Sequence, residues 1–156
     1  EAINTLDAAI WCDPSEASYF EWRSYAYRQL GNLTKALEDI NTAIGLDPLN
    51  AELFKDRASI EFDLKMNLNC LDDCLKALEL FKKGTQVRKD HILEILSKVY
   101  FRMDGTERKA LETINEAIRI NNADPDYYEH RARIQRFLNM PREAEESVAI
   151  AKRLRQ

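Results

Sequence analysis

The feature of this sequence that most constrains its fold is a segment that recurs along the chain. Its copies occupy residues 2–14, 36–48, 70–80, 110–120 and 144–151, at successive offsets of 34, 34, 40 and 34 residues. In the copies that begin at Ala36 and Ala110, small or apolar residues fall at i, i+4, i+7 and i+8, which is one face of an α-helix. Recurrence at this period indicates a stack of repeated units.

A second amphipathic segment precedes the full copies. Its recurring positions are Phe20, Arg23 and Leu30, then Phe54, Arg57 and Leu64, then Tyr128, Arg131 and Leu138. Turn residues such as Gly31 and Asn32 separate the two segments of a pair, and Asp47-Pro48 ends the second one because proline cannot continue a helix. Each unit is therefore predicted to be a helical hairpin.

Composition supports an all-α fold and excludes two other classes. The chain has only four glycines, four prolines and three valines, so it lacks the turn residues and β-branched residues of an all-β domain. Charged residues make up 32% of the chain, the mean hydropathy is −0.50, and no run of eighteen apolar residues occurs. The first fifteen residues do not have the pattern of a signal peptide. We therefore expect no association with a membrane.

Residues 20–48 resemble the tetratricopeptide repeat family, whose pattern combines large apolar, small and aromatic residues, a Leu-Gly turn, alanines and a closing proline. The matching positions are Phe20, Ser24, Tyr27, Leu30, Gly31, Ala36, Ile40, Ala43 and Pro48. The resemblance implies an all-α fold, a right-handed superhelical array of antiparallel helix hairpins, or α-solenoid. In such an array neighbouring hairpins share one continuous core.

The repeat spacing predicts a single domain over residues 1–156. We expect the second helix of a truncated repeat at 1–13, repeats at 15–50 and 51–84, a divergent repeat at 90–124, and a last repeat with the C-terminal end at 125–156. The period slips by six residues near 81–90, which indicates either longer flanking helices or a basic loop. The register of the first helix of the divergent repeat is open by one residue. Because the chain begins with Glu1 rather than Met, we expect it to be part of a longer protein.

In the tetratricopeptide repeat family the first helices of the hairpins line the concave side of the stack, so their outward positions are candidates for partner binding. The predicted peptide-binding residues are Glu21, Trp22, Tyr25, Lys55, Asp56, Ser59, Lys98, Arg102, Glu129, His130 and Arg133. Trp22 and Tyr25 are candidate anchors because aromatic rings provide large contact area at low entropic cost. Packing of Trp22 against the preceding helix is the alternative. We expect a non-catalytic protein–protein interaction scaffold that binds a peptide segment in its groove.

Some members of the family hold the acidic carboxyl terminus of a partner with a clamp of lysines, asparagines and an arginine. At the sixth position of the first helix, where that clamp has asparagine and then arginine, this chain has Trp22, Asp56 and His130. The resemblance therefore does not extend to the carboxylate clamp.

Charge is distributed unevenly along the chain. Residues 1–80 contain 15 acids and 7 bases, whereas residues 81–156 contain 12 acids and 16 bases. A groove that is acidic at one end and basic at the other would suit a mixed-charge segment. The basic half leaves RNA binding as an alternative, although the pI of about 5.3 is low for a nucleic-acid-binding domain. Self-association and a regulatory role within a larger protein are further alternatives.

We predict no catalytic residue, no metal site and no cofactor, because the sequence lacks a glycine-rich phosphate loop and a set of ligands at metal-binding spacing. The three cysteines, Cys12, Cys70 and Cys74, lack the paired spacings of a secreted disulfide scaffold. Cys70 and Cys74 lie on one helix face and are expected to be buried as small apolar residues. These features predict a reducing, cytoplasmic location.

Two arginines occur at a spacing that suggests ion pairs within a repeat. Arg23 and Arg57 each precede an aspartate, Asp39 or Asp73, by sixteen residues. Across a helical hairpin this spacing brings the two side chains together, so we predict an ion pair in each unit.

Overall fold

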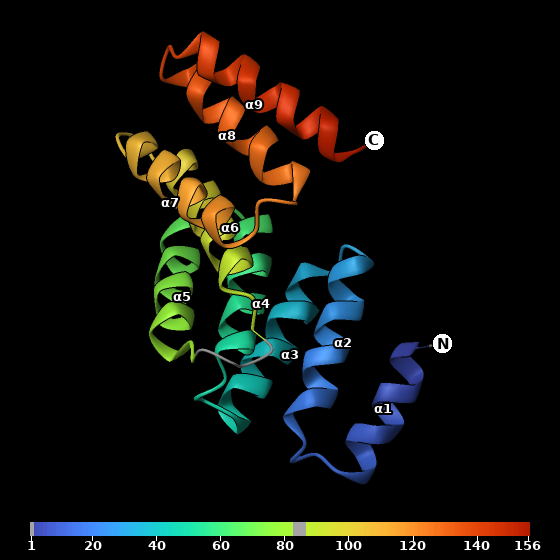
Figure 1. The fold of residues 1–156 in the computed structure, drawn as a ribbon. Coiled ribbons are helices and arrows are strands. Elements are labelled where there is room, and N and C mark those ends of the chain that lie inside the picture. The colour runs from blue at the N-terminus through green and yellow to red at the C-terminus, as the bar shows by residue number, and fades with distance from the viewer. Residues whose placement is uncertain (1, 83–86) are drawn as a thin grey trace. The chain divides into compact units, whose positions relative to one another are not determined.

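The computed structural model describes residues 2–82 and 87–156, and within these ranges the chain forms nine α-helices and no strand. The helices are α1 (Ala2–Cys12), α2 (Ala17–Gln29), α3 (Leu33–Leu46), α4 (Ala51–Asp63), α5 (Asn67–Leu80), α6 (Lys89–Arg102), α7 (Glu107–Ile120), α8 (Pro125–Phe137) and α9 (Pro141–Leu154). From α2 onward, consecutive helices pair into hairpins (Figure 1). The all-α prediction is confirmed. None of the helices in the described ranges has the length and apolarity that crossing a membrane requires.

Each hairpin turns at a residue with a left-handed backbone. The φ angle is 75° at Gly31, 62° at Lys65, 78° at Gly105 and 58° at Asn139. Glycine adopts this conformation without a steric penalty, whereas a lysine side chain is strained there. The turn between α4 and α5 is therefore built from a less favourable residue than the turn between α2 and α3.

The core of each hairpin is built from small residues on its second helix. Ala36, Ala43, Ala77, Ala110 and Ala117 are completely buried, which lets the neighbouring helices approach closely. Around Ala36 and Ala43 the core combines Phe20 and Ile40 with Leu53 and Ile60 of α4, so one hairpin continues into the next. Cys70 and Cys74 of α5 are buried free thiols, as predicted.

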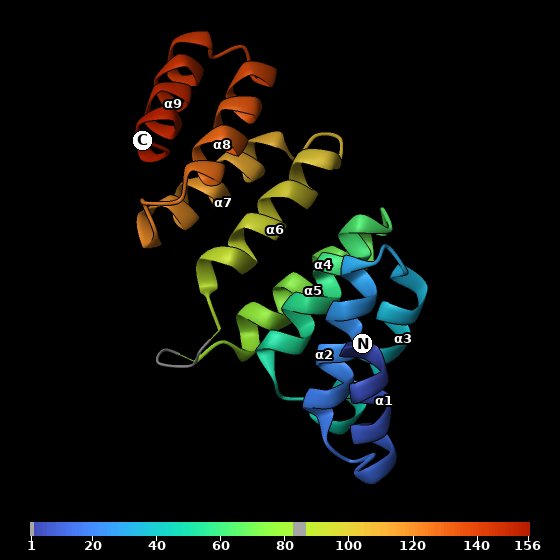
Figure 2. The same ribbon diagram turned by 90° about the vertical axis from the view of Figure 1, so that its right-hand side faces the viewer.

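The chain divides into two compact units, Glu1–Val87 and Arg88–Gln156. In the first unit each helix from α1 to α5 packs against the next one along the chain (Figure 1). In the second unit α6 pairs with α7, α8 pairs with α9, and α7 packs against α8 (Figure 2). The prediction of a single domain over residues 1–156 stays a prediction.

The break in the repeat period falls between the two units. α5 ends at Leu80 and α6 begins at Lys89, so residues 81, 82, 87 and 88 are not helical. The other residues of the insertion, 83–86, lie outside the described residues. The register of α6 is settled by Ser97, whose hydroxyl donates to the Ala110 carbonyl at 2.7 Å. Ser24 makes the same 2.7 Å bond to the Ala36 carbonyl, so Ser97 occupies the place of Ser24.

The predicted ion pairs within the repeats are confirmed. Arg23 donates two hydrogen bonds to the Asp39 carboxylate, at 2.8 and 2.7 Å. Arg57 donates two to Asp73, at 2.6 and 2.8 Å. This two-point geometry is the strong form of an arginine–carboxylate contact, and it fixes the second helix of each hairpin against the first.

Candidate functional site

The predicted residues of the first unit lie on the first helices of two hairpins. Glu21, Trp22 and Tyr25 are on α2, and Lys55, Asp56 and Ser59 are on α4. The structure brings Glu21, Tyr25 and Asp56 together in one hollow, which is also lined by Ser24, Arg28 and Ile60. Arg28 joins α2 to α4 through a 2.8 Å ion pair with Asp63.

Two aromatic side chains of α2 are exposed: Tyr25, which lines this hollow, and Trp22, three residues before it on the same helix. Trp22 has 55% and Tyr25 has 62% of its surface exposed. The Trp22 ring lies tilted against Tyr19 on its own helix, with 6.2 Å between the ring centroids. More than half of each side chain is therefore free to contact a partner.

Glu21 carries an unbalanced negative charge in the hollow. Its carboxylate makes no hydrogen bond or ion pair with the residues that the structure describes. Burial, together with the carboxylates of Asp56 and Glu52, raises the pKa of Glu21 to about 7, because both effects disfavour its charged form. A cationic group placed beside Glu21 would stabilise the ionised carboxylate.

Lys55 is held by two acids of its own helix. Its ammonium group contacts Glu52 and lies 3.0 Å from a carboxylate oxygen of Asp56. Burial by itself would lower the pKa of Lys55, but Asp56 and Glu52 raise it above its usual value. Burial also raises the pKa of Asp56 even though Lys55 opposes this. Lys55 is thus paired with acids of its own helix, and its charge only partly offsets the rise in the pKa of Glu21.

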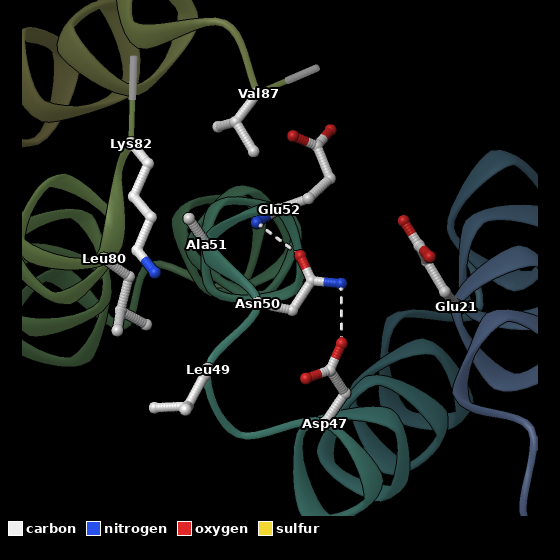
Figure 3. A pocket seen from close by; sticks show the side chains of 9 residues that line it. All are labelled: Glu21, Asp47, Leu49, Asn50, Ala51, Glu52, Leu80, Lys82 and Val87. Atoms are coloured by element: carbon white, nitrogen blue, oxygen red, sulfur yellow. Dashed lines mark hydrogen bonds between the residues drawn. The ribbon is translucent and has the colours of Figure 1, made fainter. Parts of the chain in front are cut away.

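A larger pocket of about 640 Å³ opens beside Glu21 (Figure 3). Its lining residues are Glu21, Asp47, Leu49, Asn50, Ala51, Glu52, Leu80, Lys82 and Val87. The Asn50 side chain organises the wall at the start of α4: its amide nitrogen donates to Asp47 at 3.0 Å, and its oxygen accepts from the Glu52 backbone N–H at 3.0 Å. Carboxylates outnumber ammonium groups in this lining, so the pocket favours a positively charged ligand.

In the second unit, His130 lies inside the fold. Only 6% of its surface is exposed, and its Nε2 is 3.0 Å from the Ser97 hydroxyl. The Ser97 proton goes to the Ala110 carbonyl, so His130 must donate its own Nε2 proton to Ser97. Burial, with Lys98 and Arg133 nearby, lowers the pKa of His130 to about 4. At neutral pH the ring is therefore uncharged and fixed in one orientation.

The other predicted residues of the second unit lie at its surface. Arg102, Glu129 and Arg133 are exposed, and Lys98 is half-buried with its ammonium 2.5 Å from Glu94. Glu129 pairs with Arg155 at 2.8 Å. The exposed Phe137 packs edge-on against Phe101 with 5.6 Å between ring centroids, so this surface combines basic and aromatic groups.

Sequence reasoning missed the wall formed by Asp47 and Asn50. In the sequence, Asp47 is recognisable only as part of a helix-ending signal, but an asparagine directly before a helix, such as Asn50, also indicates an N-cap. That signal places Asn50 at the start of α4, next to the predicted binding residues. For the described ranges, no group of three or more potential metal-ligating side chains is found.

Residues 17–48 match the sequence profile of the tetratricopeptide repeat family. Two curated relatives are similar over most of this chain. Human tetratricopeptide repeat protein 13 is 27% identical over 119 residues, which cover 76% of this chain and 13% of the relative. The Hsp70-Hsp90 organizing protein of Triticum aestivum is 26% identical over 133 residues, which cover 85% and 20%. The chain therefore spans no more than a fifth of either relative's length.

The arrangement of the helices is shared with solved structures. The crystal structure of MamA superposes with a TM-score of 0.81 at 20% sequence identity, over 98% of this chain and 86% of that one. At this identity the likeness concerns the fold alone. It confirms the expected helical-repeat solenoid.

Proposed function

Because the chain belongs to the tetratricopeptide repeat family, we propose that it is a non-catalytic scaffold whose α2–α4 surface binds a peptide segment of a partner protein. One observation carries the proposal. Tyr25 and Trp22, both more than half exposed, lie one helical turn apart on α2, and Tyr25 lines the hollow in which Glu21 makes no ion pair with the described residues. Exposed aromatic rings next to an unbalanced charge are typical of the centre of a binding site.

The chemistry of this surface selects one kind of segment. Apolar side chains would cover Trp22 and Tyr25, and a lysine or arginine of the segment would place its charge near Glu21 and in the adjoining pocket with Asp47 and Glu52. Such a contact is favourable because it removes apolar area from water and balances the half-buried carboxylate of Glu21. The preferred ligand is therefore a segment with an apolar residue close to a basic one.

An acidic carboxyl terminus is a poor ligand for the same surface. The wheat relative is named for Hsp70 and Hsp90, but in this chain the clamp positions of the first unit are Trp22 and Asp56. Glu21 and Asp56 would repel a terminal carboxylate rather than hold it. We therefore propose recognition without a carboxylate clamp.

The test uses short peptides selected from a random library against the whole chain, with affinity measured by fluorescence anisotropy. The double variant Trp22→Ala/Tyr25→Ala should bind the selected peptides about thirtyfold more weakly, since an aromatic anchor of this kind is worth roughly 2 kcal/mol. Trp11→Ala is the matched control, because Trp11 is an 89% exposed tryptophan on α1 and does not line the hollow.

Unchanged affinity in a double variant with an unchanged circular dichroism spectrum would defeat the proposal. Selection of peptides that end in acidic residues would contradict the preferred chemistry. Glu21→Gln provides the finer measurement. It should lower the affinity for peptides that contain lysine or arginine and leave the affinity for neutral peptides unchanged.

A further inference from the structure

A second pocket of the first unit lies away from the α2–α4 surface, where α3, α4 and α5 meet. Its volume is about 350 Å³. Its lining residues are Leu37, Asn41, Arg57, Glu61, Met66, Asn69, Asp72 and Asp73. None of these residues lines the hollow of the proposed peptide site, so this pocket is a separate feature.

Glu61 is the unusual group in this pocket. Its exposed fraction is 5%, and its Oε2 is buried without a hydrogen-bond partner among the described residues. The Arg57 Nε atom is 4.0 Å from the other carboxylate oxygen of Glu61, which is too far for a hydrogen bond. Arg57 instead uses its N–H groups on Asp73 and, at 2.9 Å, on Asn41. A buried carboxylate oxygen without a donor is costly, so Glu61 is in an unfavourable environment.

The charged groups around Glu61 do not balance the negative charge of its ionised carboxylate. Asp73 and Asp72 on α5 and Arg57 on α4 act on Glu61, the buried thiol of Cys74 lies near it, and α3 contributes uncharged Leu37 and Asn41. Burial, followed by the charge of Asp73, raises the pKa of Glu61 to about 8 even though Arg57 opposes this, and a hydrogen bond from the protonated Glu61 carboxyl group to Asp73 raises it further. Three carboxylates thus share one guanidinium, which is already committed to Asp73.

The fold does not require a carboxylate at this position. Spacing along the repeats places Glu61 where the α2–α3 hairpin has Tyr27 and the α8–α9 hairpin has Gln135. Gln135 accepts a 2.7 Å hydrogen bond from Ser147, so a neutral side chain fits and is satisfied there. An ionisable carboxyl group kept in a site that accepts an amide indicates a role beyond packing.

We propose that the pocket between α3, α4 and α5 binds the ammonium group of a lysine side chain from a partner polypeptide. In the complex, the ionised Glu61 carboxylate is the negative partner of that ammonium. Asp72 adds a second negative charge at the exposed edge of the pocket. The side chains of Leu37 and Met66 offer apolar surface for the lysine stem, while the amide oxygens of Asn41 and Asn69 can accept its remaining protons. A compact ammonium reaches a buried oxygen more readily than a planar guanidinium does.

Binding at this pocket would be linked to pH. A carboxyl group with a pKa of about 8 is mostly protonated at neutral pH, so an incoming ammonium must displace that proton. Lysine itself stays charged up to about pH 10. Affinity should therefore rise with pH, by up to about tenfold per unit below pH 8.

The experiment titrates the isotope-labelled whole chain with n-butylammonium and with an acetylated, amidated Gly-Lys-Gly peptide, followed by NMR. Both should shift the amide signals of Glu61, Asn69 and Asp72, and both should lower the pKa measured from the Glu61 carboxyl carbon. Glu61→Gln should weaken both ligands about tenfold, the loss expected for one charge-assisted hydrogen bond. Glu38→Gln is the matched control, because it removes the same charge from an exposed position on α3 outside the pocket.

Each outcome decides the proposal. Loss of affinity in Glu61→Gln alone, with affinity of the unaltered chain rising from pH 6 to pH 8, supports it. Equal weakening in Glu38→Gln, signal shifts elsewhere, or pH-independent binding would overturn it. So would binding of n-butylammonium without binding of the peptide, because the pocket would then take free amines rather than lysine side chains.

Discussion

The hairpins α2–α3 and α4–α5 share one plan and differ in the residues that surround it. Each fixes its two helices with an arginine that donates two hydrogen bonds to an aspartate sixteen residues later. In the α2–α3 hairpin, Arg23 also donates a hydrogen bond to the carboxylate of Asp7 at 2.6 Å. In the α4–α5 hairpin, Arg57 instead donates to the side-chain amide oxygen of Asn41 at 2.9 Å. The same backbone hairpin therefore supports two different charge environments.

Three departures from the favourable pattern are concentrated at the end of α4 and the start of α5. Glu61 replaces the aromatic Tyr27, Lys65 replaces Gly31 at a left-handed φ angle, and Met66 replaces the N-cap Asn32. Two of the three new residues, Glu61 and Met66, line the pocket between α3, α4 and α5. Unfavourable residues thus gather beside the pocket, which is where a functional constraint would compete with folding.

The largest expected difference between the hairpins concerns the two arginines. Arg57→Met leaves the buried carboxylates of Asp73 and Glu61 without a cation, whereas Arg23→Met leaves buried Asp39 and the exposed Asp7. We expect Arg57→Met to lower the free energy of unfolding by about 3 kcal/mol and Arg23→Met by about 2 kcal/mol. Urea denaturation at pH 8.5, where most of Glu61 is ionised in the unaltered chain, measures both. Equal losses would show that Glu61 does not add to the charge burden of its hairpin.

The next effect is a pH dependence that belongs to the α4–α5 hairpin. The pKa of Glu61 is about 8 in the folded chain against an ordinary 4.5, so the folded chain binds the extra proton between these values. The free energy of unfolding should therefore fall as pH rises from about 5 to 8. Glu61→Gln should remove much of this fall and stabilise the chain by about 2 kcal/mol at pH 8.5.

Glu21→Gln is the control for that measurement. The pKa of Glu21 is raised to about 7, so it contributes to the decline in the same direction. Because Glu21 is less buried than Glu61, the variant should flatten the profile less. A profile that Glu61→Gln leaves unchanged would contradict the assignment of this titration to the α4–α5 hairpin.

A smaller effect is expected at the two turns. Lys65→Gly should raise the free energy of unfolding by about 1 kcal/mol, since it removes a side chain from a left-handed conformation. The reciprocal Gly31→Lys should lower it by a similar amount, and strain alone would cause the loss, because a Cβ at Gly31 meets no atom within 4 Å. Thermal unfolding of the two variants is the measurement. Shifts of the same sign would show that the turns are not equivalent.

Residue spacing along the chain predicts some of these features and leaves others open. The helical hairpins and the Arg23–Asp39 pair depend on residue intervals along helices, so the sequence was sufficient to predict them. The raised pKa of Glu21 and the burial of His130 depend on side chains that other helices bring near. The position of His130 in the repeat predicts that it faces the groove. In the structure it is buried and forms a hydrogen bond with Ser97 on α6.

The smallest expected effect is at the start of the second helix. The Asn32 side chain caps α3 by accepting a hydrogen bond from the Lys35 backbone N–H at 3.3 Å, whereas Met66 gives α5 no such bond. Met66→Asn should supply the cap, which is worth about 1 kcal/mol, but it also removes a half-buried apolar side chain, so the net gain should be about 0.5 kcal/mol. Amide hydrogen exchange over the first turn of α5 isolates the cap from the lost packing, because only the cap protects those N–H groups. Slower exchange there without a gain in the global free energy of unfolding would show that packing of the Met66 side chain contributes as much stability as the new cap does. If exchange is also unchanged, the two hairpins do not differ at this position.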